Sequence, residues 1–283
     1  EYGYVFGGAI DNRGIIGNIS GDFIGNHASS EYGYVFGGAI DNRRGTIGNI
    51  TGDFIGNHAS ANEYGYVFGG AIYNEGGTIG DITGDFIGNH ASVETGTAQG
   101  GAIHNIGTIG NITGDFIGNY ASAANSSSDA DTYAYGGAIY NAYGTIGNIT
   151  GDFIGNYASE GGAIVNGGTI TIAGASTFTD NYVEVNGKKT SNAIHNEGTI
   201  NFNGTNIVVN DAITGENGTI NIASSSNGMT TFNNSVSGNT INLNQGTLKL
   251  GHYTSEKFGD SEGSFADDVD FVANGGILNL GDK

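Results

Sequence analysis

The chain has 283 residues, of which 54 are Gly and none is Pro or Cys, and its formal net charge is −20. The acidic surface repels nucleic acid phosphates and anionic lipid headgroups, so these two classes of partner are excluded. The lack of Cys excludes disulfides, thiolate metal sites and thiol nucleophiles. No run of about 18 apolar residues marks a spanning helix, and residue 1 lies inside a repeat, so we expect a segment of a longer protein.

The first two thirds of the sequence repeat one motif. The tetrapeptide Gly-Gly-Ala-Ile begins at residues 7, 37, 69, 100, 136 and 161. The shortest interval, from 136 to 161, indicates a unit of 25 residues, and the other copies carry insertions. In the copy that starts at residue 69, three short apolar runs (70–72, 78–82 and 85–89) are separated by Gly and small polar residues. Three short strands per unit predict one rung of a parallel β-helix, with rungs about 4.8 Å apart.

Equivalent positions of such a fold stack on one another, so we expect ladders of identical side chains. The Ile ladder is Ile10, Ile40, Ile72, Ile103, Ile139 and Ile164, and the Phe ladder is Phe23, Phe54, Phe86, Phe116, Phe153 and Phe178. One Asn ladder is Asn12, Asn42, Asn74, Asn105, Asn141, Asn166 and Asn196, and the other is Asn26, Asn57, Asn89, Asn119, Asn156 and Asn181. An amide can both donate to and accept from its neighbours along such a ladder.

Beyond these repeats the pattern becomes looser. We predict regular β-helix repeats with loop insertions over 1–197, and shorter, irregular rungs over 198–283 with an acidic loop at about 251–272. Altogether we predict an all-β, right-handed parallel β-helix of roughly ten rungs.

The combination of Gly-Gly-Ala-Ile with Phe-x-x-Asn about a dozen residues later resembles the repeat of the polymorphic membrane proteins. More widely, it is similar to the passenger domains of autotransporters (type V secretion). The resemblance implies a secreted passenger on a bacterial cell surface, linked to an outer-membrane translocator outside this segment. It also implies a role in virulence as an adhesin for host-cell, glycan or neighbouring-cell ligands, without catalysis.

The candidate ligand-binding residues lie in the insertions that follow the Asn-His-Ala-Ser or Asn-Tyr-Ala-Ser corner, because solenoids usually carry function there. They are Tyr32, Tyr34, Tyr64, Tyr66, Tyr133 and Tyr135. Such tyrosines can bind sugar rings or a protein, or they can pack against the rod. A structural fibre or spacer rod with self-association is the alternative function.

Ionisable side chains suggest two alternatives to a simple binding rod, namely a bound metal ion and an enzyme. Two acidic sets can bind calcium or lie solvated at corners: Asp22, Asp53, Asp85, Asp115 and Asp152, and Asp260, Glu262, Asp267, Asp268 and Asp270. The column His27, His58 and His90 continues as Tyr120, Tyr157 and Tyr182, which favours packing over metal binding. A polysaccharide-cleaving enzyme would use Asp11 and Asp41 with nearby Arg residues, but that column varies from copy to copy.

Overall fold

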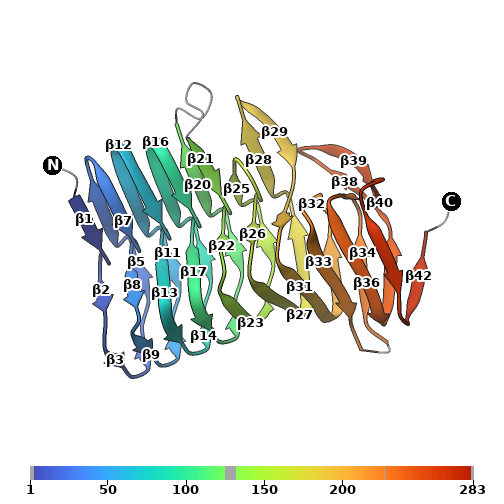
Figure 1. The fold of residues 1–283 in the computed structure, drawn as a ribbon, viewed down its shortest axis with the longest axis horizontal. Coiled ribbons are helices and arrows are strands. Elements are labelled where there is room, and N and C mark those ends of the chain that lie inside the picture. The colour runs from blue at the N-terminus through green and yellow to red at the C-terminus, as the bar shows by residue number, and fades with distance from the viewer. Residues whose placement is uncertain (1–2, 125–131, 226, 282–283) are drawn as a thin grey trace.

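The computed structural model describes residues 3–124, 132–225 and 227–281, and strands form nearly all of its regular structure (Figure 1). The strands stack side by side into a long parallel solenoid. Within the described residues, only two strand pairs are antiparallel, and both are hairpins that leave the solenoid. No helix in the described ranges is long and apolar enough to cross a membrane.

The first face of the solenoid confirms the prediction of about ten rungs. It begins with the strand of each Gly-Gly-Ala-Ile motif, and the Ile residues pair in register from one rung to the next. Its strands are β2 (Ile10–Asn12), β8 (Ile40–Arg43), β13 (Ile72–Ile79), β17 (Ile103–Ile109), β22 (Ile139–Asn141), β26 (Ile164–Asn166), β30 (Ile194–Asn196), β32 (Ile213–Gly215), β35 (Ser235–Val236) and β40 (Ser264–Phe265).

The second face carries the Thr-Ile strands. They are β3 (Ile15–Ile16), β9 (Thr46–Ile47), the ends of β13 and β17, β23 (Thr145–Thr150), β27 (Thr169–Thr179), β31 (Thr199–Val209), β33 (Gly218–Ala223), β36 (Asn239–Gln245) and β41 (Asp270–Ala273). Four short strands follow the next corner: β4 (Ile19–Ser20), β10 (Ile50–Thr51), β14 (Ile82–Thr83) and β18 (Ile112–Thr113).

The third face carries the Phe strands. They are β5 (Phe23–Ile24), β11 (Phe54–Ile55), β15 (Phe86–Ile87), β19 (Phe116–Ile117), β24 (Phe153–Ile154), the ends of β27 and β31, β34 (Met229–Phe232), β37 (Thr247–Leu250) and β42 (Ile277–Asn279).

The core consists of the predicted ladders. The Phe rings stack from Phe23 to Phe178 with centroids 4.5–4.8 Å apart, and from Phe54 onward they are fully buried. Burial of each Phe or Ile side chain contributes roughly 1.5–3 kcal/mol, so the stacked ladders supply the main stabilisation of each rung.

Both Asn ladders form, and all of their members except the half-buried Asn26 are buried. In the second ladder Asn89 Oδ1 accepts hydrogen bonds from the backbone N–H and Nδ2 of Asn57, at 3.0 and 2.9 Å. Asn89 Nδ2 donates to Phe54 O and to Asn119 Oδ1, at 2.8 and 3.0 Å. Each amide thus satisfies backbone groups at a corner where the strands cannot do so.

The described parts of the insertions form a ridge of strands rather than loops, which corrects the expectation of loop insertions there; residues 125–131 of the longest insertion lie outside the described residues. The outgoing layer consists of β6 (His27–Ser30), the first parts of β12 (His58–Phe68) and β16 (His90–Gln99), β20 (Tyr120–Ala123) and β25 (Tyr157–Ala158). The returning layer consists of β1 (Gly3–Phe6), β7 (Gly33–Phe36), the second parts of β12 and β16, and β21 (Tyr133–Tyr135). Figure 1 shows this ridge above the first faces of the blue and green rungs.

Small side chains hold the two layers of the ridge together. Buried Ala59 and Ala61 of the outgoing layer share one apolar cluster with Val67 of the returning layer. The layers approach so closely that a Cβ at Gly65 would lie 2.6 Å from the Ala61 Cβ. The ridge is therefore a second, thin core beside the solenoid.

The C-terminal part also differs from expectation. The acidic segment at about 251–272 is not a large loop: it holds the hairpin of β38 (His252–Ser255) and β39 (Gly259–Glu262), followed by the rung strands β40 and β41. A second hairpin, of β28 (Tyr182–Val185) and β29 (Lys188–Ser191), extends the outgoing layer of the ridge.

Candidate binding surface

The six predicted tyrosines all lie in or next to the returning layer of the ridge. Tyr34 is on β7, Tyr64 and Tyr66 are on β12, Tyr133 and Tyr135 are on β21, and Tyr32 directly precedes β7. Tyr34 pairs in register with Tyr66, which pairs with Thr97, which pairs with Tyr133. Because alternate residues of a strand face opposite sides, Val35 and Val67 fill the ridge while Tyr34 and Tyr66 face outward.

These tyrosines form two groups rather than one continuous patch. In the first group, Tyr34 stacks on Tyr4 and on Tyr66, with centroid distances of 5.2 and 5.1 Å. The Tyr32 hydroxyl donates to Glu63 Oε2 at the tip of the ridge. In the second group, the ring centroids of Tyr133 and Tyr135 are 5.8 Å apart, and Tyr133 is 45% exposed. The rung of Thr97 separates the two groups.

The angle between the ridge and the first face is closed by packed side chains. Phe36 and Phe68 of the ridge contact Tyr73, and Phe68 contacts His104, with centroids 5.0–5.7 Å apart. The Arg43 guanidinium lies 3.7 Å from the centre of the Phe36 ring. Burial lowers the pKa of His104 to about 3, so this imidazole is neutral. The aromatic residues at this angle therefore serve packing.

Asp11 and Asp41 do not form an open carboxylate pair. Asp41 has no exposed surface, and Arg43 Nε lies 3.0 Å from its Oδ2, whereas Asp11 is exposed. Burial raises the pKa of Asp41 to about 6, although Arg43 opposes this shift. A glycosidase pair needs both carboxyl groups beside a substrate, and Asp41 is enclosed by protein.

The angle between the ridge and the first face opens where the returning layer of the ridge ends. The next rung carries only Glu160 in place of an insertion, and Glu160 forms an isolated bridge with Tyr135. A cavity of about 210 Å³ lies here, lined by Tyr133, Tyr135, Glu160 and Val185 among others. An aromatic face next to a carboxylate suits a sugar ring, whose C–H face stacks while its hydroxyl groups donate hydrogen bonds.

Glu160 belongs to a small charged cluster that sequence analysis did not identify. The His195 Nε2 lies 3.3 Å from Glu160 Oε1 and 3.5 Å from Glu197 Oε1. Burial raises the pKa of Glu160, and His195 opposes the shift. The available signal was the shortest repeat interval, which leaves Glu160 alone in place of an insertion beside Tyr135. No spacing rule identifies His195 as the partner of Glu160.

The first acidic set and the His column take structural positions. In the Asp column, Asp53 Oδ1 accepts the backbone N–H of Asp85 at 2.8 Å, and the same bond recurs from Asp22 to Asp152. The column from His27 to Tyr182 stacks face to face at 4.6–5.0 Å. Over the residues that the structure describes, no three His, Asp or Glu side chains form a group that could hold a metal ion.

Comparisons of this chain with protein-family models, with curated proteins and with solved structures give no match.

Proposed function

We propose that the chain is a non-catalytic passenger domain of the autotransporter type, displayed on a bacterial cell surface, and that it acts as an adhesin. Its ligand is a host-cell, glycan or neighbouring-cell molecule, and the outer face of the returning layer binds it. The translocator that anchors it to the outer membrane lies outside this segment. The repeat motif, Gly-Gly-Ala-Ile with Phe-x-x-Asn, supports the assignment to this class.

One observation carries the binding role: aromatic side chains occupy an outward row that the core does not need. In the rung of β16 the same outward positions hold Thr95, Thr97 and Gln99, and Val93 and Ala98 of that rung are still buried in the apolar cluster of the ridge. Since the fold accepts Thr there, the stacked tyrosines of the other rungs serve contact with a partner.

The experiment uses the substitutions that the chain itself contains. Tyr34→Thr with Tyr66→Thr changes the first group, and Tyr133→Thr with Tyr135→Gln changes the second. We expect binding to a glycan array or to host cells to fall at least tenfold in one pair or in both. Circular dichroism confirms folding. Undiminished binding by both folded variants would overturn the proposal.

A structural spacer is the second candidate, and the continuity of the ladders favours it. The same pairs of side chains stack across successive rungs, so the rod keeps its cross-section as rungs are added. If the unmodified chain binds no ligand and forms end-to-end assemblies in analytical ultracentrifugation, this second function replaces the first.

A further inference from the structure

The two antiparallel hairpins enclose a cleft that none of the predicted tyrosines touches. The cleft has a volume of about 640 Å³ and lies between β28–β29 and β38–β39, which project from the same side of the rod (Figure 1). Residues that line it include Lys188, Thr190, Asn192, Asn234, Phe258 and Ser261. Hydroxyl and amide groups dominate the full lining, which also holds one aromatic ring, the ammonium groups of Lys188 and Lys189 and the carboxylate of Asp260.

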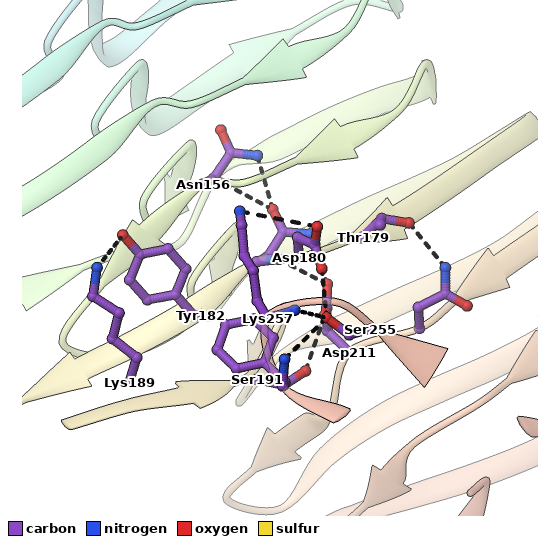
Figure 2. Close-up of polar contacts among 12 residues, drawn as sticks. Asn156, Thr179, Asp180, Tyr182, Lys189, Ser191, Asp211, Ser255 and Lys257 are labelled. Carbon is purple, nitrogen blue, oxygen red and sulfur yellow. Dashed lines mark hydrogen bonds and ion pairs between the residues drawn. The ribbon is translucent and has the colours of Figure 1, made fainter. Parts of the chain in front are cut away.

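The β38–β39 hairpin is held in place by a polar cluster. Ser255 Oγ donates to Asp180 Oδ1 at 2.8 Å and accepts the backbone N–H groups of Lys257 and Phe258 at 3.0 and 3.1 Å. Figure 2 shows this contact, together with Lys257, whose Nζ lies 3.9 Å from Asp180 Oδ2. The turn that carries Phe258 is thus fixed against the rod. A preformed wall reduces the entropy that binding costs.

At the floor of the cleft, the sequence departs from the repeat motif that forms the corner in the preceding rungs. The six preceding rungs have Gly at the second position of Gly-Gly-Ala-Ile, and the next rung reads Ser-Asn-Ala-Ile. Ala163 N donates to Ala193 O, a register that places Asn192 at the position of Gly162. The break in the motif therefore brings an amide side chain to a corner that is otherwise bare.

The amide of Asn192 is incompletely satisfied. Its Nδ2 donates to Thr214 Oγ1 at 3.2 Å, but its Oδ1 accepts no hydrogen bond within the described part of the chain, although the residue is only 5% exposed. A buried carbonyl oxygen without a donor is unfavourable, and native proteins usually provide a partner. Asn192 lines the cleft, so a ligand donor that reaches this oxygen from the cleft would supply the missing partner.

We propose that this cleft is a saccharide-binding site. Ligand hydroxyl groups donate to Asn192 and bond to the Ser, Thr and Asn side chains around it, the Phe258 ring packs against a sugar face, and Lys188 contacts ring or carboxylate oxygens at the rim. The cleft volume of about 640 Å³ lies within the usual range of small-molecule sites. The inference rests on the adhesin function for its context and names the ligand class, but it uses residues separate from the tyrosine face.

The test compares three variants on an array of neutral, amino and acidic oligosaccharides, followed by calorimetry with the best ligand. Asn192→Gly restores the residue of the other corners, Phe258→Ala removes the aromatic wall, and Asn203→Gly changes an exposed Asn of β31 as the control. We expect at least tenfold weaker binding for the first two variants and unchanged binding for the control.

Three results would overturn the inference: no glycan binds the unmodified chain, the folded Asn192→Gly and Phe258→Ala variants bind as well as the unmodified chain, or the control loses binding equally. The tyrosine variants separate the two proposals. If they alone abolish glycan binding, the adhesin surface stands and the cleft site fails. If Asn192→Gly alone abolishes it, the cleft is the site and the tyrosine face is not.

Discussion

Asn181 donates two hydrogen bonds to a single carboxylate oxygen of Asp211: its backbone N–H lies 3.0 Å and its Nδ2 lies 2.9 Å from Oδ2. Asp211 occupies the next position of the second Asn ladder, and its other oxygen accepts from Ser191 Oγ at 2.9 Å. A carboxylate only accepts hydrogen bonds, so it ends the ladder. It is also 3% exposed, which makes its charge costly.

Asp211 makes the stability of the protein depend on pH. Burial raises the pKa of Asp211 from 3.8 to about 6, although hydrogen bonds from Asn181 and Ser191 oppose the shift. Because the folded pKa is above the unfolded one, the folded state binds the proton more tightly, and the free energy of unfolding falls as pH rises from about 4 to 6. The shift corresponds to a loss of up to about 3 kcal/mol.

The variant Asp211→Asn removes this group and continues the ladder. We expect it to be more stable than the unmodified chain by about 1–3 kcal/mol at pH 7 and nearly equal to it at pH 4. Urea denaturation at several pH values measures both. An equal effect of the substitution at pH 4 and pH 7 would contradict the role of ionisation.

Removal of Arg43 leaves Asp41 as a buried, unpaired charge. Arg43→Met should lower the free energy of unfolding by about 3 kcal/mol at pH 7, because the charged Asp41 loses its partner. The cost should be smaller near pH 4, where Asp41 is protonated since its pKa is already about 6 with Arg43 present. Asp41→Asn in the same chain should recover most of the loss. A cost independent of pH would show that only the packing of Arg43 on Phe36 matters.

The second Asn ladder should be far more sensitive to substitution than an exposed row at another corner, in which the side-chain oxygen of one rung accepts the backbone N–H of the next. That row consists of Asn18, Asn49, Asp81, Asn111 and Asn148. Asn89→Ala removes an amide with four hydrogen bonds and leaves buried backbone and side-chain groups without partners, at a cost of roughly 2–5 kcal/mol. Asn111→Ala is the matched control, because this exposed Asn makes similar bonds that water replaces. Chemical denaturation compares the two, and equal costs would refute the argument from burial.

Substitution of two glycines in one rung distinguishes the stability cost of backbone strain from the cost of a steric collision. Gly69 and Gly88 have φ angles of 66° and 62°, so Ala is strained at both. A Cβ at Gly69 would also collide with Ile72 O, whereas a Cβ at Gly88 meets nothing within 4 Å. We expect Gly88→Ala to cost about 1 kcal/mol and Gly69→Ala to cost several times more or to prevent folding. Similar thermal stability of the two variants would show that the corner can relax.

The sequence was sufficient for the solenoid because identical residues at fixed intervals can stack only in register. The ladders that include Ile72, Phe86 and Asn89 follow from the repeat alone. The ridge did not follow, because its strands pair between rungs whose insertions differ in length, and no pattern within one copy reveals that pairing. The β38–β39 hairpin was missed because an antiparallel pair of acidic strands carries no repeat signal.

The candidate sites were harder to predict than the fold. The alternation in Tyr64–Gly65–Tyr66 places both tyrosines on one side of a strand once the strand is known. The pairing of Glu160 with His195 and the cleft around Asn192 depend on contacts between different rungs. The departure of Ser191–Asn192 from the glycine pair was visible in the sequence, but its meaning depends on the hairpins beside it.

Because equivalent residues stack in register, recombination can lengthen or shorten the rod by one rung at a time. Residues 1–13 recur as residues 31–43, so unequal crossing over between such copies adds or removes one rung. The new junction would again place Ile on Ile, Phe on Phe and Asn on Asn. The Ile and Asn pairs are the same at each step from β8 to β22, and the Phe pairs are the same at each step from β11 to β24. Recombination can therefore change the length of the rod without the need for a new interface between rungs.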